Sequence, residues 1–410
     1  MNLKLTAPIF VQLELTEGCN HRCFYCSNTF SHSEVKMNYS QIQRVVDELA
    51  SNQVFSAVLT GGEPFTHRKG LHYAIDSLDD HEIEAIVNTN LSIPINDRDI
   101  AKLRKCKFVL VSFPSYNEAT FNETVGRESY LRVMSNLERL TSQNIGFGIN
   151  QVVTKRNKDQ VYETGKFLFE KFKVTSFSAS PMVPIRTEDR EYSLDRQETL
   201  RIGYDLLRLE KDFPEIRTDI LECIPACLFP ESMRSHRMAH HGCSAGKDMA
   251  VISPKGFVRR CVKTHETYGN IFDEDLKVIW ERILEFEKPE SKLCSRCLSA
   301  TACSGGCEVR AIFDGTDNLV CGSEDPYKNT PLKSIDGGEY TIPKIRWRKE
   351  GDSLLIIGGE DGLVFGNEVL LRFLQSLEER RFSLDEVMRA YGPKSKSLLN
   401  YLYNKRLVKK

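Results

Sequence analysis

The stretch Cys19-Asn20-His21-Arg22-Cys23-Phe24-Tyr25-Cys26 decides the fold, because it places three thiols in one short loop with the spacing C-x3-C-x2-C. The loop directly follows an apolar run at residues 8–15, which is typical of a buried strand. A [4Fe–4S] cluster that only carries electrons takes four Cys thiolates, so three thiolates leave one iron open to a ligand. Zinc is the alternative, with His21 as the fourth ligand. A disulfide knot or plain core thiols fit less well, because these cysteines alternate with polar residues.

A second motif, Gly61-Gly62-Glu63-Pro64, directly follows the apolar run at residues 54–60. Two consecutive glycines let the backbone approach a ligand closely. A carboxylate in the same turn can accept hydrogen bonds from an ammonium group. Read alone, the motif is only a turn. Because the motif lies downstream of the cysteine loop and at the end of a strand, it indicates that the two segments border the same binding site.

Together, the cysteine loop (residues 19–26) and the glycine turn (residues 61–64) resemble the radical S-adenosylmethionine (radical SAM) superfamily. In that family the open iron is chelated by SAM, whose cleavage gives a 5′-deoxyadenosyl radical that abstracts hydrogen from a substrate. The resemblance implies that Tyr25, just before the third cysteine, lies near the adenine. It also implies that Gly61, Gly62, Glu63 and Pro64 hold the methionyl amino group.

Three later strand ends resemble further SAM contacts of the family. Asn90 resembles the ribose contact, although Leu91 stands where glycine is usual. Ser112 resembles the next contact, but Pro114-Ser115 replaces the common Asp-Gly. Asn150 resembles the polar residue of the following strand. Taken alone, each of these side chains is equally well explained by ordinary loop chemistry.

Composition limits the class of protein. The chain has 410 residues, 13 cysteines and a net charge of -1. The length predicts two or three domains, and the balanced charge gives no case for nucleic acid or an anionic membrane as partner. An odd number of closely spaced cysteines favours metal ligation in a reducing compartment over disulfides. With no apolar signal stretch and no apolar run long enough to span a bilayer, we expect a cytoplasmic protein.

The first half of the chain alternates short apolar runs with amphipathic stretches, which predicts parallel strands joined by right-handed crossovers. We expect an α/β fold with a partial (β/α)6 barrel over residues 1–215, whose ligands lie at the C-terminal strand ends. Ser40 is suited to cap the first helix. Strands are expected at residues 57–60, 83–88, 108–113, 146–153 and 174–179, and helices at residues 40–49, 71–78, 97–103, 130–140 and 158–172.

A second group of cysteines occupies residues 216–325, and its spacing resembles the SPASM domain, which holds two auxiliary [4Fe–4S] clusters in radical SAM enzymes. A glycine-centred hairpin at residues 253–258 is expected to bring Cys243 and Cys261 together. By family pattern, the distal cluster would be bound by the distal set, which consists of Cys294, Cys297, Cys303 and Cys321. The proximal cluster would be bound by the proximal set, which consists of Cys243, Cys261 and Cys307.

The fourth ligand of the proximal cluster is expected from upstream, and Cys227 is preferred over Cys223; an open site is the alternative. A zinc ribbon over residues 294–307 is the alternative reading of the distal set. His240 and His241 are expected to be exposed or hydrogen-bonded rather than ligands, since the cysteines already suffice. Trp280 is expected to pack on an amphipathic helix.

Residues 326–340 are expected to be a linker, because Pro, Gly, Asn, Asp and Ser are frequent there. Residues 341–410 contain no cysteine and predict three strands followed by three helices. This order resembles the small winged-helix peptide chaperone of pyrroloquinoline quinone biosynthesis, a domain type that binds leader peptides. A generic winged-helix packing module is the alternative.

These resemblances predict a radical SAM/SPASM enzyme that modifies a ribosomally synthesised peptide, by a crosslink or a side-chain change. They imply three [4Fe–4S] clusters, SAM, a precursor peptide and an electron donor such as flavodoxin or ferredoxin. A radical enzyme acting on a small molecule in haem or cofactor synthesis is a second possibility. A cluster-bearing electron carrier or redox sensor is a third, although the glycine turn and Tyr25 argue against it. Beyond the SAM cluster, the sequence assigns no catalytic residue.

Overall fold

The structure is a computed structural model that describes residues 4–28, 33–234, 236–286, 294, 303–314, 334–359 and 362–410. The chain divides into two compact units, Met1–Lys328 and Asn329–Lys410. Two of the predicted cluster ligands, Cys297 and Cys321, and most of the predicted linker lie outside the described residues. Within the described part of the chain, no helix is both long and apolar enough to cross a membrane.

The first unit is built on a ten-stranded sheet with the strand order β10-β9-β8-β1-β2-β3-β4-β5-β6-β7. Strands β1 to β7 are all parallel to their neighbours, as the alternation of apolar runs predicts. They are β1 (Phe10–Glu14), β2 (Ser56–Thr60), β3 (Glu84–Thr89), β4 (Phe108–Ser112), β5 (Phe147–Val153), β6 (Ser176–Pro181) and β7 (Arg217–Asp219).

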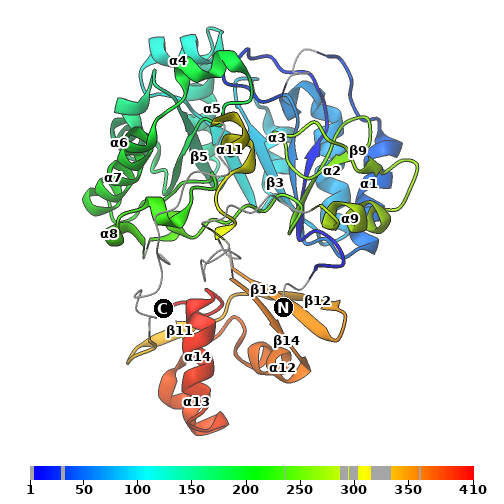
Figure 1. Ribbon diagram of the computed structural model, residues 1–410, viewed down its shortest axis with the longest axis vertical. Coiled ribbons are helices and arrows are strands. Elements are labelled where there is room, and N and C mark those ends of the chain that lie inside the picture. Colours follow the sequence, from blue (N-terminus) through cyan, green and yellow to red (C-terminus); the bar gives the residue numbers. More distant parts are fainter. Residues whose placement is uncertain are drawn as a thin grey trace. The chain divides into compact units, whose positions relative to one another are not determined.

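Helices lie outside the curved sheet and join consecutive strands (Figure 1). The strands alternate fully buried with half-buried residues, and the half-buried set includes Glu14, Asn88 and Asn150. A polar set of this kind suits the interior of a barrel that holds a ligand. The helices are α1 (Tyr39–Ser51), α2 (Arg68–Asp80), α3 (Asp97–Leu103), α4 (Glu118–Val125), α5 (Tyr130–Ser142), α6 (Val161–Phe172) and α7 (Arg196–Asp212).

Helix α1 begins earlier than the sequence predicted. Its N-cap is Asn38, whose side chain accepts the Gln41 backbone N–H at 2.9 Å, while the Gln41 side chain accepts the Asn38 N–H. This reciprocal capping box satisfies two backbone donors, so it is preferred over a cap at Ser40, which lies inside the first turn. The Ser40 hydroxyl donates to Asn38 Oδ1 at 2.7 Å instead.

A hairpin from the cysteine-rich region extends the barrel sheet. Strand β8 (Met249–Ile252) pairs in parallel with β1, and β9 (Phe257–Arg259) returns antiparallel to β8. The hairpin expected around Gly256 is therefore confirmed, with Gly256 at a φ of 84°. The buried Trp280 of α9 (Leu276–Leu284) donates its indole N–H to Leu5 O at 2.8 Å, which confirms its packing role.

The remaining elements of the first unit are short. They are the 3₁₀ turns η1 (Pro64–His67), η2 (Lys158–Gln160), η3 (Thr187–Tyr192), η4 (Ala226–Leu228) and η5 (Arg237–Ala239), the helices α8 (Glu231–Arg234) and α11 (Glu308–Asp314), and the strand β10 (Gly269–Asn270).

The second unit contains the three strands and three helices that were predicted, in that order, and two short strands that were not predicted, one before them and one between the first two helices. An antiparallel sheet is formed by β12 (Ile345–Glu350), β13 (Ser353–Gly358) and β14 (Gly362–Gly366), with β13 in the centre. The helices are α12 (Glu368–Leu377), α13 (Leu384–Tyr391) and α14 (Ser395–Asn404), and β11 (Glu339–Thr341) pairs with β15 (Arg381–Ser383).

The C-terminal end of the predicted linker is packed into this second unit. Tyr340 is only 1% exposed, and its hydroxyl accepts the backbone N–H of Asp336 at 3.0 Å. Ile335 belongs to the same hydrophobic core. An aromatic residue that buries its ring and pairs its hydroxyl contributes to stability, so residues 335–340 are part of the folded unit rather than a spacer.

Candidate metal and cofactor site

The cysteine loop and the glycine turn are held together by backbone contacts. Gly62 donates its N–H to Thr16 O at 2.8 Å, and Glu63 donates its N–H to Gly18 O at 2.9 Å. A Cβ atom on Gly62 would lie 2.2 Å from Gly18 O, so a side chain there would push the two loops apart. Gly61 has a φ of 132°, a conformation that favours glycine. The sequence signal for this turn therefore has a direct steric cause.

The three thiols of the loop lie in a desolvated environment. Burial raises the pKa of Cys19 to about 12, and it also raises the pKa values of Cys23 and Cys26. Cys26 also raises the pKa of Cys19, and Cys26 and Cys19 raise that of Cys23, whose thiol forms a hydrogen bond with the Tyr25 side chain. Thiols in such a place become thiolates only beside strong positive charge, which cluster iron supplies. The donor set therefore fits an iron–sulfur cluster.

A single metal ion fits the structure less well than a cluster. Among the described residues, no three His, Cys, Asp or Glu side chains converge closely enough to hold one ion. The zinc alternative requires His21 as a ligand. Its Nε2 atom lies 3.0 Å from Ser129 Oγ. Burial lowers the pKa of its imidazole to about 4. In a cluster the thiolates bind separate irons, so they need not converge on one point.

Residues from far along the chain clamp the cysteine loop. Arg186 donates from Nη2 to Phe24 O at 2.6 Å. The Arg156 guanidinium lies 4.6 Å from the ring centroid of Phe24 and 4.6 Å from that of Tyr192. Cation–π contacts of this kind hold the loop against the barrel. The sequence analysis missed these residues, because no local pattern marks a partner more than a hundred residues away.

Glu63 is a buried carboxylate with three protein donors. Its Oε1 accepts the Phe65 N–H at 3.1 Å and the Thr89 hydroxyl at 2.7 Å, and its Oε2 accepts the Asn90 N–H at 2.7 Å. Burial raises its pKa to about 7. An ionised carboxylate has about four acceptor positions, so one position on Oε2 remains for a ligand. Pro64 follows at the start of η1 and is buried.

Asn90 links the third strand end to the cysteine loop. Its Nδ2 lies 3.0 Å from Asn20 Oδ1 and 3.9 Å from Cys19 Sγ. Leu91 has a φ of 53°, in the left-handed region, which explains why glycine would be the favourable residue there. The structure thus brings Cys19, Glu63 and Asn90 together.

Ser112 and Asn150 lie directly opposite each other on β4 and β5. Asn150 Oδ1 accepts hydrogen bonds from Ser178 at 3.2 Å and Ser180 at 3.1 Å. Pro114-Ser115 replaces the Asp-Gly that is common in the family. Here Ser115 has a structural role, because its Oγ accepts the Asn117 N–H at 2.9 Å.

The cysteine-rich region forms a second polar centre. Lys263 Nζ lies 2.6 Å from Glu222 Oε1, and the Lys263 N–H donates to Cys261 Sγ at 3.4 Å. Beside them, Arg260 forms a two-pronged ion pair with Glu308, at 2.7 and 2.8 Å. Burial raises the pKa of Cys307 to about 11 and also raises that of Cys261.

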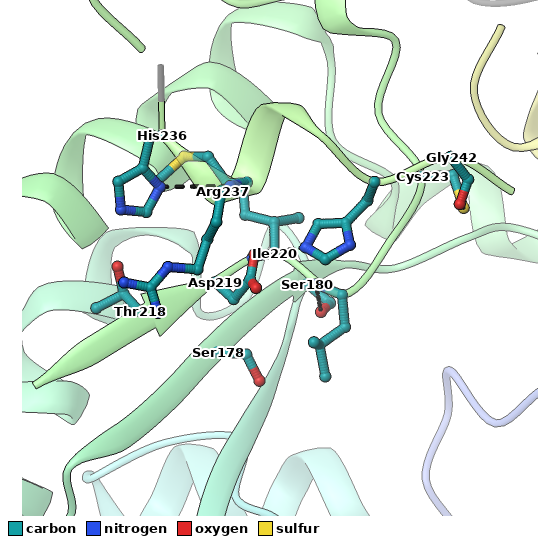
Figure 2. Close-up of polar contacts among 12 residues, drawn as sticks. Ser178, Ser180, Thr218, Asp219, Ile220, Cys223, His236, Arg237 and Gly242 are labelled. Atoms are coloured by element: carbon teal, nitrogen blue, oxygen red, sulfur yellow. Dashed lines mark hydrogen bonds and ion pairs between the residues drawn. The ribbon is translucent and has the colours of Figure 1, made fainter. Parts of the chain in front are cut away.

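The histidines before Cys243 follow their expected role. His241 Nε2 lies 2.7 Å from Asp219 Oδ1, at the end of β7. Asp219 ends β7 and lies opposite Ser178 of β6, and Ser180 follows Ser178 on the same strand (Figure 2). His241 is therefore hydrogen-bonded, and its partner is a carboxylate.

Comparison with known families identifies the class of protein. The model of the Radical SAM superfamily matches residues 13–168, and the SPASM model, an iron-sulfur cluster-binding domain, matches residues 243–298. These matches show a radical SAM domain and a SPASM domain within the chain. This agrees with the parallel sheet, the cysteine loop and the second cysteine group.

Among curated relatives, the mycofactocin maturase MftC of Mycolicibacterium smegmatis is 27% identical over 76% of this chain and 81% of its own length. The AdoMet-dependent heme synthase of Methanosarcina barkeri is 25% identical over 78% of this chain and 96% of its own length. The chain thus resembles one relative that is named as a maturase and one that is named as a heme synthase.

Solved structures share the fold. Streptococcus suis SuiB bound to the precursor peptide SuiA superposes with a TM-score of 0.64 at 20% identity, covering 78% of this chain and 76% of that one. The enzyme anSMEcpe with bound AdoMet gives a TM-score of 0.58 at 20% identity, covering 73% of this chain and 88% of that one. The predicted α/β partial barrel is therefore confirmed.

Proposed function

We propose that the protein is a radical SAM/SPASM maturase that modifies a ribosomally synthesised peptide. The radical SAM and SPASM domains support SAM and [4Fe–4S] clusters as cofactors. We assign three clusters, with Cys19, Cys23 and Cys26 holding the one that binds SAM. When bound, that cluster and SAM supply a radical that removes hydrogen from the substrate. The distal and proximal sets of cysteines would hold the two auxiliary clusters.

The residues of this chain would orient SAM and exclude water. Glu63 is fixed by Phe65, Thr89 and Asn90, and its one free acceptor position would receive the amino group of SAM. Gly61 and Gly62 would let that group approach the backbone. Asn90, which is already bonded to the cysteine loop, would meet the ribose, and Tyr25 would lie near the adenine. Ser112 and Asn150 would border the same ligand from the next two strand ends.

The proposal that the substrate is a peptide rests on the architecture of the second unit. Among the described residues, its strands β12 and β14 each pair only with β13, so they form the two edges of this sheet. An extended peptide can add to such an edge through main-chain hydrogen bonds. Trp347 on β12 is 46% exposed and would give the added strand an apolar contact. The maturase relative supports the same substrate class.

The test compares the full chain with a chain that ends at Lys328, the boundary between the two compact units. Iron content and slow SAM cleavage should be the same in both. The probe is a candidate precursor peptide, chosen from short reading frames beside the gene. Its affinity should fall at least tenfold in the shorter chain, while high concentrations of core peptide should still be modified poorly. Equal affinity would remove the leader-binding role.

A second candidate function is a radical SAM enzyme that acts on a small molecule in haem or cofactor synthesis. The relative that favours it is the heme synthase, which this chain matches over 96% of that protein's length. This candidate makes the opposite prediction for the second unit, because a small substrate needs no leader-binding module. Turnover of a porphyrin precursor by both chains at equal rates would establish it.

A further inference from the structure

Two cysteines upstream of the proximal set, Cys223 and Cys227, differ in what they contact. The carbonyl of Cys223 accepts the backbone N–H of Cys307 at 3.0 Å. The thiol of Cys223 lies 3.4 Å from the carbonyl of Gly242, the residue before Cys243 (Figure 2). Cys223 thus contacts Cys307 itself and the residue next to Cys243, and both cysteines belong to the proximal set.

A close approach of two backbone segments produces this arrangement. Gly306 has a φ of 86°, and a Cβ atom there would lie 2.7 Å from Pro225 Cδ and 3.4 Å from Cys223 O. Only glycine allows the turn before Cys307 to lie this close to residues 223–225. The position of Cys223 is therefore fixed by the backbone and not by a flexible side chain.

The sulfur atoms are close enough to interact. The thiol of Cys223 forms a hydrogen bond with that of Cys243, which raises the pKa of Cys223, and burial raises it further. Cys243 also raises the pKa values of Cys261 and Cys307, for which burial is the larger cause. Cys223 and Cys307 also line one cavity of about 200 Å³.

The segment that carries Cys227 contacts the other group of cysteines. It belongs to the turn η4 (Ala226–Leu228). The residue before it, Ala226, donates its N–H to Cys303 Sγ at 3.4 Å. Cys303 belongs to the distal set, so this contact places the start of η4 beside the distal thiols.

We propose that Cys223, together with Cys243, Cys261 and Cys307, is the fourth thiolate ligand of the proximal auxiliary cluster, and that Cys227 is not. This assignment rests on the proposed function, because it takes the proximal set to bind a cluster. It replaces the choice of Cys227 that sequence spacing favoured. Four thiolates leave no iron of this cluster open, so the substrate cannot bind to it directly.

The test uses full-length protein in which Cys19, Cys23 and Cys26 are changed to Ala, so that only auxiliary clusters remain. In this background, Cys223→Ala should lose about four of roughly eight irons, or keep the iron with a changed EPR spectrum of one cluster. Cys223→Ser, which offers an oxygen ligand, should retain iron and shift the spectrum. The matched control, Cys227→Ala, should equal its parent in iron content, EPR spectrum and circular dichroism.

An unchanged Cys223→Ala spectrum, or a changed spectrum in Cys227→Ala, overturns the assignment. The combined variant Cys243→Ala, Cys261→Ala and Cys307→Ala separates this failure from failure of the proposed function. If the combined variant loses about four irons while Cys223→Ala keeps both its iron and its EPR spectrum, only the role of Cys223 is wrong. If the combined variant keeps all its iron, the proximal set binds no cluster and the proposed function loses one of its parts.

Discussion

Lys263 and Glu222 form an ion pair, with 2.6 Å between Nζ and Oε1, beside the thiols of Cys261 and Cys307. Burial lowers the pKa of Lys263, but Glu222 and the two thiols outweigh burial and raise it. A cation held in this way offsets negative charge on neighbouring thiolates. The pair would therefore influence how readily the proposed proximal cluster takes up an electron.

Lys263→Met should make one auxiliary cluster harder to reduce. A unit charge about 8 Å away at an effective dielectric constant of 20 contributes on the order of 2 kcal/mol, or roughly 90 mV for one electron. The midpoint potential, followed by EPR in a redox titration, should fall accordingly. The double variant Lys263→Met/Glu222→Gln removes both charges and should return toward the original value. No shift in the single variant would show that the pair acts only on packing.

Metal content tests the three cluster sites. If each site carries four irons, the anaerobically reconstituted chain should hold roughly 12 Fe. Changing Cys19, Cys23 and Cys26 together to Ala should remove about four of them and abolish all SAM cleavage. A triple variant that still forms 5′-deoxyadenosine under reduction would contradict the assignment of the SAM cluster.

Glu63→Gln should weaken SAM binding while the chain keeps its iron. The change removes the charge that strengthens a hydrogen bond to the amino group, which costs about 1.5–3 kcal/mol. It also turns one carboxylate oxygen into a donor that faces the N–H of Phe65 or Asn90. Calorimetric titration of SAM gives the affinity. Unchanged affinity would make Glu63 a structural residue that only joins β2 to β3.

The same carboxyl group gives a pH dependence. Burial raises the pKa of Glu63 from 4.5 to about 7, so the group is protonated at pH 6 and ionised at pH 8. SAM affinity should therefore rise with pH through about 7, and this rise should be absent in Glu63→Gln. Without SAM the sign is opposite, since a raised pKa in the folded state means that the free energy of unfolding falls as the pH rises from 4.5 to about 7. Thermal unfolding across this range checks the second statement.

Gly62→Ala should disrupt the contact between the glycine turn and the cysteine loop, because its Cβ would lie 2.2 Å from Gly18 O. Backbone atoms cannot yield cheaply, so we expect a loss of several kcal/mol and poor retention of the first cluster. Gly146→Ala is a matched control, since its Cβ would meet nothing within 4 Å. Equal iron retention in both variants would show that the loops can move apart without harm.

Much of the barrel was predictable because short apolar runs have a local signature. The strands at residues 57–60 and 108–113, for example, correspond to β2 and β4 within one residue at each end. Helix α7 (Arg196–Asp212) and strand β7 were not predicted. In α7 the buried residues Ile202, Leu206 and Leu209 do recur at helical spacing, so this helix was missed although its signal is present. Strand β7 is only three residues long and gives no strong periodic signal.

The site was predictable where a motif lies within a few residues, as in the cysteine loop and the glycine turn. Contacts between distant segments were not, because spacing carries no information about which segments meet. Arg156 stacking on Phe24 is one case. Cys223 and Cys227 are another case. They lie four residues apart in the sequence, and only contacts with distant segments distinguish them, such as the backbone contact of Cys223 to Cys307.

The parallel pairing of β8 with β1 has a consequence for how the chain folds. Phe10 lies opposite Met249, so the first strand gains its second neighbour only after about 240 more residues have been synthesised. Contacts of such large sequence separation form late and slowly. Until then β1 would present an unpaired edge, which is where chains aggregate. We therefore expect the barrel made alone, as residues 1–215, to be prone to association, and the two cysteine regions to fold as one cooperative unit.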